Sequence, residues 1–238
     1  MAAVQNRDQF HGAQAIGGEK LYNERGHMIV ATMSDMPEPQ CLEPDWNHSR
    51  PSIDEVRLVC NRISVTQAQL GSAAVHRFLE SIRKSHHNGG AHLAAFTLGP
   101  DVVFDWFASR NRLSDEHLID SLIVHPAIRE ALPQIQIPES KADTGLEMAD
   151  PFLLDGKLAR VLHNGGAYTN PDGDGREAKN LALEVCDTIF GLRFGQISLL
   201  ESFEAWTPWF KGIAWDMTLV LFDRRLRKLS ILAITDTD

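Results

Sequence analysis

The chain has few cysteines, and they are spaced too widely for cross-linking. Its 238 residues include three: Cys41, Cys60 and Cys186. Disulfide-rich secreted domains and zinc fingers need an even or clustered set of cysteines at close spacing. The sequence therefore excludes both classes and predicts a protein of a reducing compartment.

Long apolar runs are absent as well. No stretch approaches the roughly 18 apolar residues that a membrane-spanning helix requires. The first residues, M-A-A-V-Q-N-R-D-Q-F-H-G, lack the apolar segment of a secretory signal peptide. We therefore expect a soluble, cytoplasmic protein that does not bind membranes.

An excess of positive charge is also missing. Lys and Arg together number 23 against 32 Asp and Glu, which gives a formal net charge of -9. Nucleic-acid-binding domains show a basic face, so this balance argues against a nucleic-acid partner. It is compatible with a basic protein partner, because opposite charge accelerates the encounter.

Recognisable catalytic and metal-binding motifs are lacking too. The sequence has no G-x-S-x-G nucleophile turn, no P-loop and no G-x-G-x-x-G loop. His86, His87 and His92 do not have the spacing of known metal motifs. The segment 170–175 resembles the first half of a calcium-binding EF-hand loop, but Leu181 stands where a bidentate Glu is needed. We therefore predict no metal site and no cofactor, and we interpret 170–175 as a turn.

What the sequence does contain is a C-terminal region whose residue types favour β-strands. Three runs, 194–203, 213–222 and 229–235, are rich in β-branched and aromatic residues and are bounded by turn residues or charges. The short connection 223–228 is typical of an antiparallel hairpin. Toward its end the middle run is apolar on both faces, which predicts a central strand covered on both sides.

Amphipathic helical patterns dominate the part of the chain before this sheet. Ser52 followed by Glu55 forms a capping-box signature, and Ser114 to His117 is typical of another helix start. We predict an α+β fold, with the helical N-terminal and middle part packed on a C-terminal antiparallel sheet of about three or more strands. Residues 1–52 are expected to form an extended arm or lid, with one strand at 26–33 and with Cys41 and Trp46 as anchors. Residues 53–238 are expected to form a single domain with helices within 53–190 and the sheet within 193–236.

One five-residue motif occurs twice. His-Asn-Gly-Gly-Ala stands at 87–91 and again at 163–167, each time at the end of a helical pattern. Asn and Gly stop helices well, and a His in the last turn favours the helix dipole. Alternatively, the two loops surround one ligand or catalytic site. The site would then lie where the loops meet the sheet around Asp216, with His87 or His163 as general base. If Asp216 is buried it needs a partner, for which His163 or Arg193 is available; otherwise it lies on a solvated face of the sheet.

The connection between the first two predicted strands is rich in aromatic residues. It carries Trp206, Trp209 and Phe210. Such residues form either a rim that caps the core or an exposed contact patch, since Trp is enriched at binding hot spots. Asp236 and Asp238, after the last strand, are expected to point into solvent or at a partner.

These observations favour a protein that binds another protein over an enzyme. One concrete version is an inhibitor or immunity-type protein that neutralises a basic toxin or nuclease, and a homodimer is a further option. The predicted partner-binding residues are Trp206, Trp209, Phe210, Asp236 and Asp238. The alternative is a small hydrolase or transferase near the two HNGGA loops, with His87, His163 and Asp216 as its catalytic residues.

Overall fold

The computed structural model describes residues 21–22, 28–29, 39–169 and 173–238. The chain divides into two compact units, residues 1–38 and 39–238. In the first unit, strand β1 (Leu21–Tyr22) pairs antiparallel with β2 (Met28–Ile29). The predicted strand at 26–33 coincides with β2 in part, and its remainder lies outside the described residues, as does most of the predicted lid.

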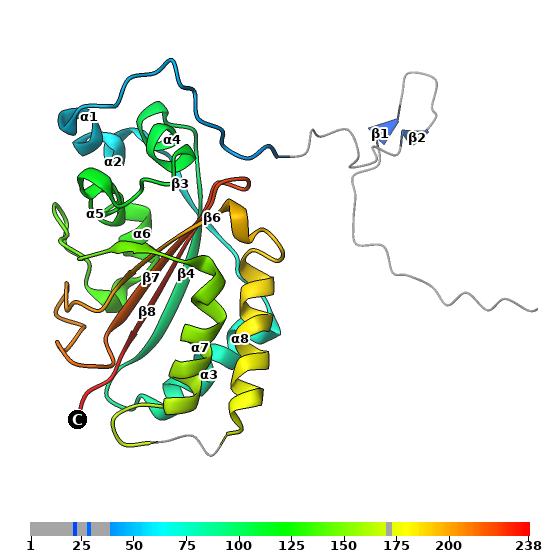
Figure 1. The fold of residues 1–238 in the computed structure, drawn as a ribbon, viewed down its shortest axis with the longest axis vertical. Coiled ribbons are helices and arrows are strands. Elements are labelled where there is room, and N and C mark those ends of the chain that lie inside the picture. Colours follow the sequence, from blue (N-terminus) through cyan, green and yellow to red (C-terminus); the bar gives the residue numbers. More distant parts are fainter. Residues whose placement is uncertain (1–20, 23–27, 30–38, 170–172) are drawn as a thin grey trace, which may run out of the picture. The chain divides into compact units, whose positions relative to one another are not determined.

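The second unit is built on a six-stranded, fully antiparallel sheet, which confirms the predicted fold class (Figure 1). Its strand order is β3-β4-β8-β7-β6-β5. The last three strands in sequence are the three that the sequence predicts, and the first three come from the region 53–190, in which the sequence predicts helices and connections but no strand. The strands are β3 (Val65–Ala68), β4 (Gly90–Leu98), β5 (Glu147–Ala149), β6 (Ile197–Ser202), β7 (Met217–Asp223) and β8 (Lys228–Thr235).

Helices cover both faces of this sheet, so that two separate hydrophobic clusters form (Figure 1). One face is covered by short helices: α1 (Ile53–Arg57), α2 (Val59–Arg62), α4 (Val102–Ser109), α5 (Leu118–Ile123) and α6 (Pro126–Ala131). The other is covered by three longer ones: α3 (Ala73–Ser85), α7 (Leu154–Asn164) and α8 (Gly175–Ile189). Four single 3-10 turns complete the described elements: η2 (Asp115–His117), η3 (Pro133–Ile135), η4 (Pro151–Leu153) and η5 (Phe194–Gln196).

Strand β7 lies in the middle of the sheet and is buried along its whole length. Leu219 and Leu221 pack against the cluster under α3, α7 and α8. Val220 and Phe222 point the opposite way and pack under the short helices, as the period of two in a strand requires. The predicted central strand is therefore confirmed.

Side-chain caps fix where several helices begin. Ser52 and Glu55 form the predicted capping box at α1. Asp174 caps α8 by accepting a 3.0 Å hydrogen bond from the backbone N–H of Arg176. The described part of the segment 170–175, residues 173–175, therefore leads into α8 and caps it, as expected of a turn before a helix. Within the described residues, no helix is long and apolar enough to cross a membrane.

Candidate functional site

The predicted aromatic loop after β6 packs mainly inward. The indole N–H of Trp206 donates a 2.8 Å hydrogen bond to the hydroxyl of Thr218. Phe210 is only 4% exposed and packs with both tryptophans in the core under the short helices. Trp209 is half-buried, with its ring edge-on to His92 at 5.3 Å. Because Phe210 is buried, it does not offer the contact surface predicted for it.

Asp236 is also buried, contrary to the expectation that it points into solvent. Asp236 comes directly after β8, and its side chain lies between the two HNGGA loops, where the residue is 0% exposed. One carboxylate oxygen accepts a 3.0 Å hydrogen bond from the backbone N–H of Asn88, and the other accepts a 2.8 Å hydrogen bond from that of Ala167. The two loops do lie together, and both oxygens of the carboxylate that they share are hydrogen-bonded and shielded from solvent. Asp238 is exposed.

The three predicted catalytic residues do not form a constellation. Asp216 lies just before β7, is 1% exposed, and accepts hydrogen bonds from the backbone N–H groups of residues 211–213 and from the hydroxyl of Thr235. The ring of His87 lies 2.9 Å from the Thr169 hydroxyl, and His163 is exposed. In the described part of the chain, no hydrogen bond or ion pair joins Asp216 to either histidine.

The predicted pairing of Asp216 with Arg193 is likewise not formed. The guanidinium of Arg193 instead binds the buried carboxylate of Asp223, at 2.9 Å from Nε and 2.8 Å from Nη2. The polar network that satisfies Asp216 is therefore one of backbone amides and a hydroxyl. These groups hold the turn before β7 in place.

A different tryptophan is exposed: Trp46 of the segment 39–52, which lies near the half-buried Trp106 of helix α4. Trp46 is 79% exposed and Val102, at the start of α4, is 81% exposed. The guanidinium carbon of Arg110 lies 4.3 Å from the ring centroid of Trp106 and 5.0 Å from that of Trp46, so the cation bridges the two indoles. We call these four residues the Trp46 surface.

Side-chain hydrogen bonds and ion pairs hold the segment 39–52 against α4 and η2. The indole N–H of Trp106 donates a 3.0 Å hydrogen bond to the carbonyl of His48. Arg110 donates to the carbonyl of Asp45, and Arg50 forms ion pairs at 3.2 and 2.6 Å with Asp115 and Glu116. These residues therefore belong to the larger unit, although the sequence-based boundary at residue 52 separates them from it.

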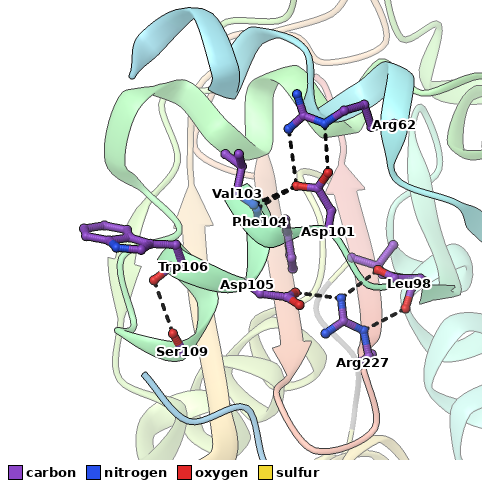
Figure 2. Close-up of polar contacts among 10 residues, drawn as sticks. Arg62, Leu98, Asp101, Val103, Phe104, Asp105, Trp106, Ser109 and Arg227 are labelled. Carbon is purple, nitrogen blue, oxygen red and sulfur yellow. Dashed lines mark hydrogen bonds and ion pairs between the residues drawn. The ribbon is translucent and has the colours of Figure 1, made fainter. Parts of the chain in front are cut away.

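Helix α4 is fixed to its neighbours by two Asp–Arg pairs (Figure 2). Asp101 caps the helix through the N–H groups of Val103 and Phe104 and also binds Arg62 of α2, with 3.0 Å to its Nε. Burial alone would raise the pKa of Asp101, but these hydrogen bonds outweigh it and the pKa is lowered. The carboxylate that starts the helix is therefore charged and doubly held.

The second pair joins α4 to the hairpin between β7 and β8 through Asp105, one helical turn after Asp101. Arg227 donates to Asp105 at 2.7 Å and to the carbonyls of Leu98 and Gly99 at 3.0 and 2.6 Å, and Figure 2 shows it between the helix and the strand end. Burial raises the pKa of Asp105, and the hydrogen bond from Arg227 offsets this only in part. The side that carries Val102 and Trp106 is thus part of a rigid element.

A hollow of about 310 Å³ lies beside the Trp46 surface, between 39–52, α1 and α4. Its charged lining is predominantly acidic: Glu43, Asp45, Glu55 and Asp105 stand against Arg50 and Arg110. A backbone hydrogen bond from Asn47 and contact with His48 lower the pKa of Asp45. Hydrogen bonds from Ser52 lower that of Glu55. Both carboxylates are therefore ionised at neutral pH.

Comparison with known proteins assigns no family to this chain. No protein-family model, no curated protein and no solved structure matched it. Function is therefore inferred from the geometry of the chain's own residues.

Proposed function

We propose that this protein acts in the cytoplasm by binding another protein through the Trp46 surface. The partner contributes a basic segment, and an inhibitor or immunity-type role toward a basic toxin or nuclease is the concrete version that we favour. The three cysteines are free thiols, in keeping with a reducing compartment. The proposed contact surface is on α4 and the segment 39–52, because the loop at 206–210 packs inward.

The observation that carries the proposal is the combination of exposure and rigidity at Trp46. A tryptophan buries roughly 150–250 Å² when it is covered, which is a large contribution for one side chain. At 79% exposure Trp46 leaves most of its surface in water, while Arg110, which also lies over the ring of Trp106, holds one side of its ring. A pre-positioned aromatic anchor binds at a low entropic cost, and Trp and Arg dominate binding hot spots.

The charges beside the anchor support a basic partner. Arg50 is engaged by Asp115 and Glu116, and Arg110 by the two indoles. Among the carboxylates that line the hollow, Asp105 is paired with Arg227, which leaves Glu43, Asp45 and Glu55. The chain as a whole carries a formal net charge of -9. Complementary charge raises the association rate, and that contribution weakens as salt increases.

The test begins with affinity capture of the tagged chain from lysate of its native host, at low and moderate salt, with mass spectrometry. A captured protein is then purified, and its dissociation constant is measured directly. We expect a basic partner whose affinity falls with salt. We also expect Trp46→Ala to weaken binding at least tenfold, as is usual for a central hot-spot residue.

The matched control is Leu192→Ala, which removes another exposed apolar side chain, 92% exposed, in the connection between α8 and β6. It is expected to leave affinity unchanged. Equal binding by the wild type and Trp46→Ala would overturn the proposal, as would a partner lost only with Trp209→Ala. Light scattering of the chain alone shows whether the partner is a second copy.

A further inference from the structure

A cluster of one histidine and two aspartates lies at the start of α5, outside the Trp46 surface. It consists of His117, Asp120 and Asp143, whose ligand atoms all lie within 4.8 Å of one another. None of the three is among the site residues expected from the sequence. The cluster has no part in the proposed protein-binding function.

Asp120 is the fixed member of this cluster. Its residue is 8% exposed, and one carboxylate oxygen accepts hydrogen bonds from both the backbone N–H and the hydroxyl of Thr144. The other oxygen lies 2.8 Å from Nδ1 of His117. One oxygen is therefore used to orient the carboxylate, and the other is directed at the histidine. Metal sites hold their ligands by outer hydrogen bonds of this kind.

The backbone directs His117 toward Asp120. Glu116 and His117 have φ values of 52° and 54°, in the left-handed region that residues other than glycine seldom adopt. An ion pair from Glu116 to Arg50 holds the first of these residues. Both left-handed residues lie in η2, directly before α5, and the ring of His117 contacts the carboxylate three positions later.

Asp143 completes the cluster and has no partner of its own. In the described residues, no cation, hydroxyl or backbone N–H is bonded to its exposed carboxylate, and neither Asp120 nor Asp143 is paired with Lys or Arg. Among the described residues, His117 is the only basic side chain that pairs with either aspartate. First-row divalent cations hold N and O ligands at about 2.0–2.2 Å, so neighbouring ligand atoms on one ion lie about 3.0–3.4 Å apart. The 2.8 Å pair and a third, exposed carboxylate within 4.8 Å fit that spacing after a small rotation of the side chains.

The cluster also stands between two hollows. All three side chains line both a hollow of about 200 Å³ and one of about 640 Å³. An ion held by three protein ligands there keeps positions open to water or to a small ligand from either side. Sites with three ligands and an open position are typical of catalytic metal ions, whereas structural zinc sites are closed by four.

We propose that His117, Asp120 and Asp143 bind one divalent first-row cation. The mixed donor set selects its class: imidazole suits zinc, and carboxylates suit manganese and magnesium. Zn²⁺ and Mn²⁺ therefore bind more tightly than Mg²⁺. Metals compete with protons for these ligands, so affinity falls as the pH is lowered.

The experiment titrates Mn²⁺ into the full chain after chelator treatment, followed by electron paramagnetic resonance and calorimetry. Mn²⁺ is the first probe because the chain's ten histidines and three cysteines offer adventitious sites to Zn²⁺. We expect one bound equivalent and a higher thermal unfolding midpoint when Mn²⁺ is present. We expect Asp143→Asn and His117→Gln each to raise the dissociation constant at least tenfold.

Glu147→Gln is the matched control, because this carboxylate lines the smaller hollow but is not part of the cluster. It is expected to bind Mn²⁺ like the wild type. Asp143 is exposed and unpaired, so its Asn variant folds normally, which circular dichroism verifies without metal. No bound equivalent, or equal affinity in Asp143→Asn and the wild type, overturns the proposal.

Discussion

The carboxylate of Asp236 provides the sharpest test of how the two HNGGA loops are held. Asp236→Asn keeps the shape of the side chain but replaces one acceptor oxygen with an NH₂ group. That group then faces a backbone N–H, of Asn88 or of Ala167, which currently donates to the carboxylate. One charge-assisted hydrogen bond is lost, and a donor is left without a partner at a site that is 0% exposed.

The expected cost follows from general values. A hydrogen bond to a charged group contributes about 1.5–3 kcal/mol, and leaving a buried partner unsatisfied costs a similar amount. We expect Asp236→Asn to lower the free energy of unfolding by about 2 kcal/mol. With a urea slope of roughly 2 kcal/mol per molar, the unfolding midpoint moves down by about 1 M. Asp236→Ala removes both acceptors and is expected to cost about twice as much.

Urea unfolding followed by circular dichroism measures these shifts. Asp238→Asn is the control, because Asp238 is exposed two positions later and such surface changes stay within about 0.5 kcal/mol. If Asp236→Asn unfolds at the wild-type midpoint, the carboxylate does not join the loops, and their contact must depend on apolar packing.

Three further predictions use the same assay. Gly89→Ala places a methyl group 2.1 Å from a backbone oxygen of β8 and therefore lowers the urea midpoint. In Gly173→Ala the methyl group meets nothing within 4 Å, so the midpoint stays the same. Equal midpoints for the two variants would contradict the close approach of Gly89 to β8. Burial lowers the pKa of His86 below its usual 6.5 despite the nearby Asp236, so the unfolded chain takes up a proton that the folded chain does not. Stability is therefore full above pH 6.5 and falls below it, and His86→Gln makes that fall shallower; an unchanged slope would refute this. Arg227→Met leaves the carboxylate of Asp105 without its 2.7 Å partner, and we expect it to lower the free energy of unfolding by about 2 kcal/mol. Ordinary surface changes stay within about 0.5 kcal/mol. A loss smaller than that would show that the pair does not hold α4.

The architecture was predictable where side-chain pattern and element coincide. Strand β7 is recognisable because its alternating residues fill two apolar faces, and α1 because Ser52 and Glu55 mark its start. Strand β4 was missed because Ala91, Ala94 and Ala95 suit a helix as well as a strand. Only pairing with β8, far along the chain, selects the extended form.

The candidate sites were predictable only in part, since each depends on contacts between distant segments. Nothing near Asp236 in sequence indicates burial, because the groups that bind it come from residues 88 and 167. Trp46 follows Pro44, and the sequence indicates a loop without showing which helix it meets. His117 and Asp120 have a local spacing, but Asp143 joins them only through the fold.

The position of β8 in the sheet has a consequence for how the protein folds. Although β8 is last in chain order, it lies between β4 and β7, and Gly90 at the start of β4 pairs with Thr235 at its end. Until β8 is in place, the sheet consists of two separate parts: β3 paired with β4, and β5 paired with β6 and β7. No strand pairing of the described sheet links these two parts without β8. Forming such long-range pairs is slow because a large loop must close first. A ribosome-bound chain that has not yet exposed β8 therefore presents two additional open sheet edges, at β4 and β7, which are templates for wrong strand pairing.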